Sequence, residues 1–360
     1  MTIQKPLKVF DGHNDAVLSL HVQGRGGGRS FFERSDKGHI DLPRAREGGF
    51  GGGLFAVFVP DDPNAGFIPT LTTKDGAYDV APSPALDSGY ARTTATALLA
   101  HLFRLERESK GQVKITRTVV EIEGALRDDV LAMVLHLEGA EPIDGGLDAL
   151  EVFYQAGVRA LGLVWSRPNI FAEGVPFRFP AGPNGGDGLT ERGRALVKAC
   201  DDLGILIDLS HLNEAGFWDV AAIARSPLVA THSNVHALCP TPRNLTDKQL
   251  DAVRDSGGMV GLNFFVGFLR PDGADDAATD LDVMVHHVDY LIEKLGVDHV
   301  GLGSDFDGAR VPAAITAVAG LPRLFDALRG QGYDEATLQK LARDNWLRAL
   351  RVAWHEENAP

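Results

Sequence analysis

Residues 9–15 read VFDGHND, a short apolar run that ends in a histidine and an aspartate two positions apart. The apolar start predicts a buried β-strand. Side chains at positions i and i+2 of a strand point to the same side, so His13 and Asp15 would offer a nitrogen and an oxygen ligand to one point. Such a pair is half of a metal site. Taken alone, however, it is explained better as an ordinary polar strand end.

The same arrangement recurs along the chain, because further apolar runs end at or next to Glu138, His211, His232 and Asp305. Seven apolar runs predict strands in addition to the first, at residues 53–59, 130–138, 158–165, 205–209, 227–231, 259–265 and 300–304. Segments with helical periodicity separate most of them. Eight strands alternating with helices predict an α/β fold, the (β/α)8 TIM barrel.

Two long stretches rich in Pro, Gly and Asp, residues 61–88 and 166–188, follow the second and fourth predicted strands. They are predicted to be long loops at the C-terminal face of the barrel, where they would form walls or lids of an active site. No linker-like change of composition divides the chain. Residues 1–360 are therefore expected to form a single barrel domain.

Composition excludes several classes of protein. The formal net charge of −14 argues against nucleic acid as a partner, because phosphate binding requires a basic surface. No run of about 18 apolar residues predicts a membrane span, and no apolar targeting segment precedes the first motif. We therefore expect a cytoplasmic protein with no membrane partner. Its two cysteines are too few for a disulfide framework.

The C-terminal ends of all barrel strands meet at one mouth, so the potential ligands should converge there. They are three imidazoles and three carboxylates, from His13, Asp15, Glu138, His211, His232 and Asp305. This set suits Zn²⁺ or a similar divalent ion. It exceeds the three protein ligands of a usual mononuclear catalytic site, so two metals sharing a bridging carboxylate are predicted. His136 shares a strand face with Glu138 and is a weaker alternative ligand.

These residues carry a resemblance to a known family, the membrane (renal-type) dipeptidases of the amidohydrolase superfamily. The similar motifs are DGHND at 11–15, LEG at 137–139, DLSH at 208–211, THS at 231–233 and GSDFDG at 303–308. The resemblance implies a zinc metallo-dipeptidase with two Zn²⁺ per chain, dipeptides as substrates and a homodimer. Carried over by position, His13 and Asp15 would bind one zinc, His211 and His232 the other, and Glu138 would bridge them.

The chemistry of these groups agrees with hydrolysis of dipeptides by a hydroxide that bridges the two zinc ions. Asp305 would take the proton of the water and give it to the departing amine, with Glu138 as the other catalytic carboxylate. The alternative for Asp305 is a carboxylate that only orients a ligand. Arg243, in a loop at the same mouth, could grip the substrate carboxylate, whereas its alternative is a surface salt bridge.

The sequence departs from the resembled family at two predicted substrate-binding positions. Trp165 stands where the family has a histidine that contacts the substrate carbonyl, and Phe265 stands where it has a tyrosine. The carbonyl contact would then come from Arg167 or be absent. Because both changes spare the predicted ligands, hydrolysis is better supported than the identity of the substrate, whose side-chain and stereochemical preferences stay open.

Two other functions are kept as alternatives. Another amidohydrolase reaction, on an N-acyl amino acid or a lactone, would keep the metals and change the pocket. Substrates without a free amine would distinguish it. A metal-binding protein without turnover is the other alternative, and a complete ligand set beside Asp305 speaks against it.

Overall fold

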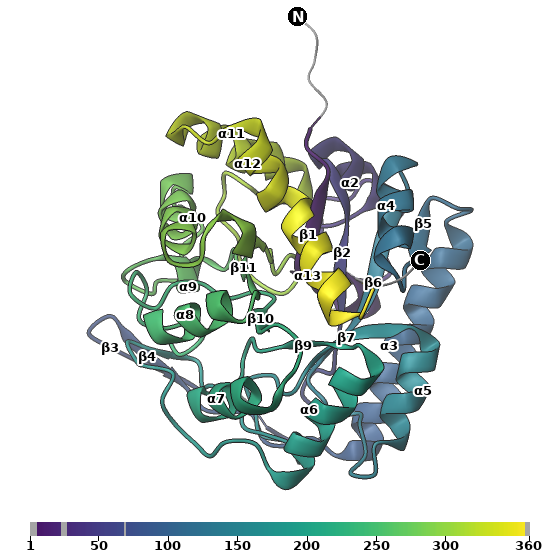
Figure 1. Ribbon diagram of the computed structural model, residues 1–360, viewed down its shortest axis with the longest axis vertical. Helices are drawn as coiled ribbons and strands as arrows, with labels where there is room; N and C mark the ends of the chain where they lie inside the picture. Colours follow the sequence, from purple (N-terminus) through teal and green to yellow (C-terminus); the bar gives the residue numbers. More distant parts are fainter. Residues whose placement is uncertain (1–5, 23–26, 68–69, 357–360) are drawn as a thin grey trace, which may run out of the picture.

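The computed structural model describes residues 6–22, 27–67 and 70–356. The terminal residues, on which the expected absence of a targeting signal partly depends, lie outside these ranges. Eight parallel strands form the barrel, with helices around it (Figure 1). In barrel order they are β1 (Val9–Asn14), β2 (Phe50–Phe58), β6 (Leu131–Glu138), β7 (Val158–Gly162), β9 (Leu206–Asp208), β10 (Val229–Ala230), β11 (Met259–Leu262) and β12 (Val300–Leu302). The predicted fold class is confirmed.

The first and last strands meet through the segments at their C-terminal ends. The Asp305 N–H donates to the carbonyl of His13 at 3.0 Å, and the Asp15 N–H donates to the carbonyl of Phe306 at 2.8 Å. The buried carboxylate of Asp11 also accepts hydrogen bonds from the Ser304 N–H (2.8 Å) and hydroxyl (2.7 Å). The barrel is thus nearly closed, and its closure brings two predicted site residues, His13 and Asp305, together.

Most of the helices lie between consecutive strands. They are α1 (Ala16–His21), α2 (Leu42–Gly48), α3 (Ser88–Glu108), α4 (Val119–Arg127), α5 (Asp148–Ala156), α6 (Glu191–Leu203), α7 (Glu214–Ile223), α8 (Asp247–Asp255), α9 (Val266–Leu269), α10 (Leu281–Leu295), α11 (Leu321–Gln331), α12 (Glu335–Gln339) and α13 (Asn345–Ala353), with short 3₁₀ turns at Val297–His299 and Val318–Gly320 and a π turn at Lys340–Asp344. Side-chain caps begin several of them. The Thr190 hydroxyl, for example, accepts from the Gly193 N–H at 3.0 Å at the start of α6.

The interior of the barrel is filled by one apolar cluster, and a second cluster packs between the strands and the helices. Trp346 of α13 belongs to the interior cluster, is fully buried and donates from Nε1 to the carbonyl of Leu302 at 2.9 Å. Glycines make room for its ring, since a Cβ at Gly12 would lie 2.2 Å from it. With the interior packed in this way, polar chemistry is confined to the mouth.

The two long stretches predicted as loops contain strands, which corrects that expectation. A separate antiparallel sheet combines β3 (Leu71–Lys74), β4 (Ala77–Val80) and β8 (Arg178–Phe179). The β3–β4 turn is Asp75-Gly76, with φ of 51° and 82°, the left-handed pair that favours a tight hairpin. A further strand missed by the prediction, β5 (Val113–Ile115), pairs with β6 outside the barrel order.

Among the described residues, no helix is long and apolar enough to cross a lipid bilayer.

Candidate metal centre and substrate cavity

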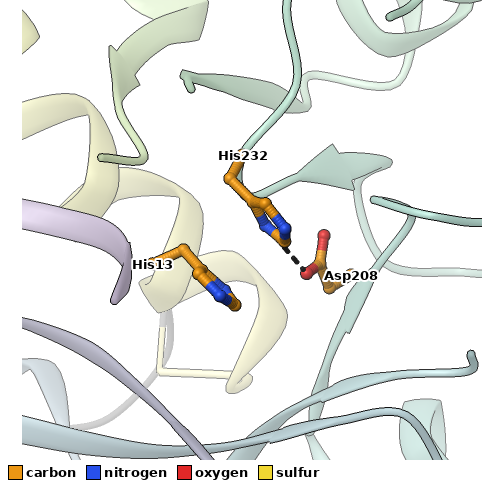
Figure 2. Close-up of side chains that lie close together, drawn as sticks. All are labelled: His13, Asp208 and His232. Atoms are coloured by element: carbon orange, nitrogen blue, oxygen red, sulfur yellow. Dashed lines mark ion pairs between the residues drawn. The ribbon is translucent and has the colours of Figure 1, made fainter. Parts of the chain in front are cut away.

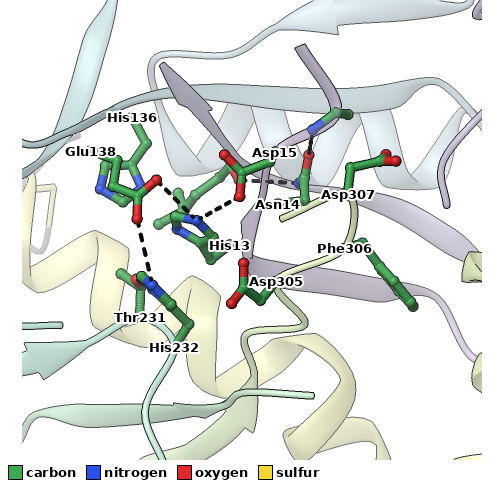
Figure 3. A network of polar contacts seen from close by, with 12 residues as sticks. His13, Asn14, Asp15, His136, Glu138, Thr231, His232, Asp305, Phe306 and Asp307 are labelled. Atoms are coloured by element: carbon green, nitrogen blue, oxygen red, sulfur yellow. Dashed lines mark hydrogen bonds and ion pairs between the residues drawn. The ribbon is translucent and has the colours of Figure 1, made fainter. Parts of the chain in front are cut away.

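The six side chains predicted to converge all lie at the C-terminal ends of the barrel strands. Figure 3 labels five of them, all except His211. His13 is in β1, and Asp15 directly follows that strand. Glu138 ends β6, and the other three follow β9, β10 and β12: His211, His232 and Asp305. The strands that carry them are short, parallel and buried, so the side chains at their ends are held by the barrel itself.

Glu138 lies at the middle of the group. Its Oε2 is 3.6 Å from Nε2 of His13, which is 3.5 Å from Oδ2 of Asp15. Its Oε1 is 3.2 Å from Nε2 of His211 and 3.8 Å from Nε2 of His232. One oxygen of a single carboxylate therefore faces each pair of ligands. This is the arrangement that a bridging carboxylate between two cations requires.

The residues fit a pair of metal ions by their donor atoms as well as by their positions. His13, Asp15 and Glu138 offer ligand atoms within 4.8 Å of one another, and so do Glu138, His211 and His232. Both ring nitrogens of His13 and Oδ1 of Asp15 are buried without a hydrogen-bond partner among the described residues. Unsatisfied buried polar atoms are costly, and coordination to a cation would satisfy these atoms.

The charges in this buried space favour a cation. Burial opposes a charge on His13, but the carboxylates of Glu138, Asp15 and Asp305 outweigh it and raise the pKa of His13 to about 10. Burial, with the neighbouring carboxylates, raises the pKa of Glu138 well above its usual value, and that of Asp305 is raised for the same reasons. A crowd of carboxylates that attracts a proton so strongly would also attract a divalent ion.

His211 and His232 respond in the opposite direction. Burial lowers the pKa of both imidazoles well below the usual value, and the positive charges of Arg243 and His13 add to the effect. Both rings are therefore neutral, which is the form that binds a metal.

A chain of hydrogen bonds orients the ring of His232. Its Nδ1 lies 2.8 Å from the hydroxyl of Thr231, which donates to Oδ2 of Asp208 at 2.6 Å. Asp208 Oδ1 is also occupied, by the backbone N–H groups of Thr231 (2.8 Å) and Ser210 (2.9 Å). Asp208 forms a third group with His13 and His232 (Figure 2). Because its oxygens are already used, we assign it to support of His232.

The ring of His211 has a different support, the hydroxyl of Ser166, which lies 2.8 Å from its Nδ1. The supporting roles of Ser166, Thr231 and Asp208 were not predicted from the sequence. Thr231 and Asp208 belong to the THS motif at 231–233 and the DLSH motif at 208–211, so their proximity to predicted ligands in the sequence was a usable signal. No such signal marks Ser166.

Two of the site residues have strained backbones. His211 has a φ of 68° and Asp305 a φ of 57°, in the left-handed region that costs a non-glycine residue roughly 1–2 kcal/mol. Asp305 Oδ2 accepts from Nδ2 of Asn263 at 3.0 Å. A Cβ at Gly308 would lie 2.2 Å from Oδ2 of Asp15 and 2.4 Å from Oδ1 of Asp305, so glycine is needed for both carboxylates to reach the site.

Arg243 is not a surface residue, since its relative exposure is 2%. Its guanidinium donates to the carbonyl of His232 at 3.0 Å and to the hydroxyl of Ser233 at 3.3 Å. Its Nε is buried with no hydrogen-bond partner, and among the described residues no carboxylate forms a direct ion pair with it, although Asp305, Asp208 and Glu138 act on it electrostatically. Burial lowers the pKa of Arg243 to about 10. The surface salt bridge considered as its alternative role is therefore excluded.

A cavity of about 700 Å³ opens above the candidate metal centre. Asp15, Glu138, His211 and Asp305 line it, together with residues of the β3–β4 hairpin. Trp165 and Phe265, two of the three predicted substrate-binding residues, line this cavity. Arg243 does not itself line the cavity. Its Cζ lies 5.3 Å from the ring centre of Phe268, and Phe268 is one of the lining residues.

Arg167 does not supply the carbonyl contact suggested as a replacement for the missing histidine. It is fully buried and donates to Oε1 of Glu141 (2.7 Å), Oδ1 of Asp61 (3.2 Å) and the carbonyl of Val59 (2.5 Å). Its Cζ lies 5.1 Å from the ring of Trp165. Arg167 therefore supports the cavity wall from behind, a role that depends on contacts between distant segments.

His136, the weaker alternative ligand, belongs to none of the three ligand groups found among the described residues. Its ring packs edge-on against His13, with 5.4 Å between the centroids, and its Nε2 lies 3.5 Å from Oδ2 of Asp208. It lies beside the predicted ligands rather than among them.

Comparison with known proteins agrees with this site. The family model described as Membrane dipeptidase (Peptidase family M19) matches residues 1–359. A solved dipeptidase of the same family is 47% identical, with a TM-score of 0.89 over 97% of this chain and 99% of that one. A metallo peptidase from Rhodobacter sphaeroides, solved with a phosphinate mimic of the dipeptide L-Ala-D-Ala, is 46% identical to this chain and has a TM-score of 0.90. The match covers 97% of this chain and 100% of that one.

An uncharacterised Klebsiella pneumoniae protein, from the region 5′ of pqqA, is 52% identical over 258 residues, which are 72% of this chain and 95% of that protein. The family match and the solved relatives cover nearly the whole chain, including every element that carries the candidate site. The chain therefore belongs to the membrane dipeptidase family.

Proposed function

We propose that this protein is a zinc dipeptidase with a two-metal centre. One Zn²⁺ would be held by His13 and Asp15, a second by His211 and His232, and Glu138 would be shared by both. The observation that carries the proposal is the position of Glu138, whose Oε2 lies 3.6 Å from His13 while its Oε1 lies 3.2 and 3.8 Å from His211 and His232. The relative solved with a dipeptide mimic supports the substrate class.

Two divalent ions held by these residues would supply Lewis-acid chemistry, which activates a water for attack on the peptide carbonyl at neutral pH. Asp305 would take the proton from the attacking water and deliver it to the departing amine. Its carboxylate lies at the mouth beside the ligands, where burial raises its pKa and Asn263 fixes one oxygen. A raised pKa suits a group that must both accept and release a proton.

Arg243 would bind the free C-terminal carboxylate of the substrate. Its guanidinium is buried, has one unpartnered nitrogen and no ion pair among the described residues. A buried cation of this kind is stabilised when an anion reaches it. Recognition of a terminal carboxylate by the guanidinium would restrict hydrolysis to short peptides with a free C-terminus.

The test combines metal analysis with a substrate panel on the purified protein. We expect about two zinc ions per chain, cleavage of dipeptides, loss of activity on chelation and its return on adding Zn²⁺. N-acetylated dipeptides and dipeptide amides should be poor substrates. Activity that survives complete removal of metal would overturn the mechanism. Hydrolysis of N-acyl amino acids or lactones without hydrolysis of dipeptides would overturn the substrate class.

A further inference from the structure

The cavity above the candidate centre has a continuous aromatic wall. Ring centres are separated by 5.0 Å between Phe58 and Trp165, 5.4 Å between Trp165 and Phe177, 6.2 Å between Phe177 and Phe268, and 4.7 Å between Phe268 and Phe265. All five side chains line the cavity. They come from the ends of β2, β7 and β11 and from the segments that follow those strands, so segments far apart in the chain build one apolar surface.

The remaining wall offers little for recognition of a charged substrate side chain. Among the described residues that line the cavity, none is a lysine or an arginine. Asp272 and Asp275 also line the cavity but are already paired, with Arg270 at 2.6 Å and Arg310 at 3.4 Å. The hairpin contributes Leu71 and the ring of Tyr78. An apolar substrate side chain would therefore have the smallest desolvation cost on entering this cavity.

Arg243, as the proposed carboxylate-binding residue, would determine which substrate residue meets the wall. Its Cζ is 5.3 Å from the centre of the Phe268 ring, and Phe268 is stacked with Phe177 at an interplanar angle of 12°. The carbon that bears a terminal carboxylate also bears the side chain of that residue. A carboxylate bound by Arg243 would thus bring the C-terminal side chain of a dipeptide to Phe268 and Phe177.

The wall is held in place before a substrate arrives. The carbonyl of Phe268 accepts from Nδ2 of Asn244 at 2.8 Å, and the carbonyl of Phe177 accepts from the Val80 N–H of the hairpin at 2.9 Å. Arg167 lies behind Trp165 and Phe58, at 5.1 and 5.2 Å from their ring centres. A rigid apolar surface loses little conformational entropy on binding and so discriminates well between side chains.

We propose that this site selects dipeptides whose C-terminal residue is large and apolar, with Phe177 and Phe268 as the residues that determine this specificity. The inference depends on the proposed dipeptidase function and narrows its substrate class. In a closed apolar pocket, each added methylene of the substrate raises kcat/KM by at most roughly 10–200-fold. The gain is smaller where the pocket is open. We expect Ala-Phe and Ala-Leu to exceed Ala-Gly by about tenfold or more.

The experiment measures kcat and KM of the zinc-loaded enzyme for two substrate series. One varies the C-terminal residue (Ala-Gly, Ala-Ala, Ala-Leu, Ala-Phe, Ala-Asp, Ala-Lys, with L and D forms), and the other varies the N-terminal residue (Gly-Ala, Leu-Ala, Phe-Ala). The apolar preference should appear in the C-terminal series, mainly in KM. If it appears only in the N-terminal series, or if the C-terminal series is flat, the inference is wrong. If no dipeptide is cleaved by metal-loaded protein, the proposed function itself has failed.

Variants of Phe177 separate specificity from folding. F177A should lower the ratio of kcat/KM for Ala-Phe over Ala-Gly by about tenfold, because it removes apolar contact area that only the larger substrate uses. F177L should restore most of that ratio. F103A alters a partly buried phenylalanine of α3 that does not line the cavity and should leave the ratio unchanged. An equal loss for both substrates in F177A would assign Phe177 a structural role and overturn the inference.

Discussion

The Oε1 atom of Glu138 lies 3.2 Å from Nε2 of His211, while the other oxygen of the same carboxylate faces His13. His13 is in β1, Glu138 ends β6 and His211 follows β9. The barrel brings the C-terminal ends of these three strands together. The relationship makes Glu138 the residue on which the two halves of the candidate centre depend. Removing its charge is therefore the most informative single change to the ligand set.

We expect E138Q to bind fewer than two zinc ions per chain and to lose essentially all dipeptidase activity, because an amide cannot bridge two cations as a carboxylate does. Metal analysis after dialysis and an assay with Ala-Ala measure both effects. The exposed Glu151 of α5 provides a matched control, E151Q. An E138Q protein that keeps both metals and full activity would contradict a bridging role.

Asp305 separates catalysis from metal binding. D305N should retain both zinc ions, while kcat falls by roughly 10²–10⁴-fold, the usual cost of losing a general acid–base group. Asn263 can still donate to the remaining side-chain oxygen of the variant. Loss of metal together with activity would indicate that Asp305 is a ligand. An activity loss of less than about tenfold would remove it from proton transfer.

Arg243 is expected to act mainly on binding. R243M should lower kcat/KM for dipeptides by about 10–100-fold, the range for loss of charge-assisted hydrogen bonds. It should also reduce the preference for a free carboxylate over the corresponding dipeptide amide, a ratio that general destabilisation does not change. An unaltered ratio in R243M would show that another group recognises the carboxylate.

The hydroxyl of Thr231 links His232 to Asp208, and its removal tests that support. T231V should weaken zinc binding by about 10–100-fold, as is typical when the outer partner of a histidine ligand is lost. T231S keeps the hydroxyl and should bind zinc like the natural protein. Competition with a chromophoric chelator measures the affinity. Equal affinities for the valine and serine variants would mean that the hydrogen bond does not contribute.

His287 gives a pH dependence away from the candidate centre. Its Nδ1 accepts from the Val235 N–H at 3.3 Å and its Nε2 lies 2.9 Å from the carbonyl of Leu269. Burial lowers the pKa of His287 to about 4, with the neighbouring His286 adding to the effect. The neutral ring therefore contributes its full stability above the unfolded pKa of about 6.5, and this contribution is lost progressively as the pH falls from about 6.5 to the folded pKa of about 4.

The full contribution of neutral His287 to the free energy of unfolding is about 3 kcal/mol, set by the difference between its folded and unfolded pKa. Urea unfolding of the natural protein and of H287Q between pH 7.5 and 4.5, at a constant excess of zinc, measures it. The free energy of unfolding should fall more steeply with decreasing pH in the natural protein than in H287Q. Parallel curves would show that His287 does not contribute.

The sequence predicted the parts of the structure that depend on local pattern. Apolar runs marked every barrel strand, and a ligand at the end of five of them predicted the convergence that the fold produces. It failed where the outcome depends on distant partners. The Asp75-Gly76 turn makes a hairpin, but its first strand, β3, is exposed, and its partly buried second strand, β4, gains another partner only in β8, about 100 residues further along the chain.

The burial of charged groups also could not be predicted from the sequence. Arg167 and Arg243 both follow barrel strands, and nothing in their neighbourhoods indicates that one is held by two carboxylates while the other has none. Phe177 and Phe268 likewise line the cavity because long segments fold back over the mouth. The homodimer implied by the family resemblance stays a prediction.

Anomalous diffraction from crystals of the zinc-loaded protein would show whether two zinc ions share Glu138. Data on either side of the zinc absorption edge should show two strong peaks, one beside His13 and Asp15 and one beside His211 and His232, with the Glu138 carboxylate between them. A single peak, or two peaks of which only one contacts Glu138, would contradict a two-zinc centre bridged by Glu138.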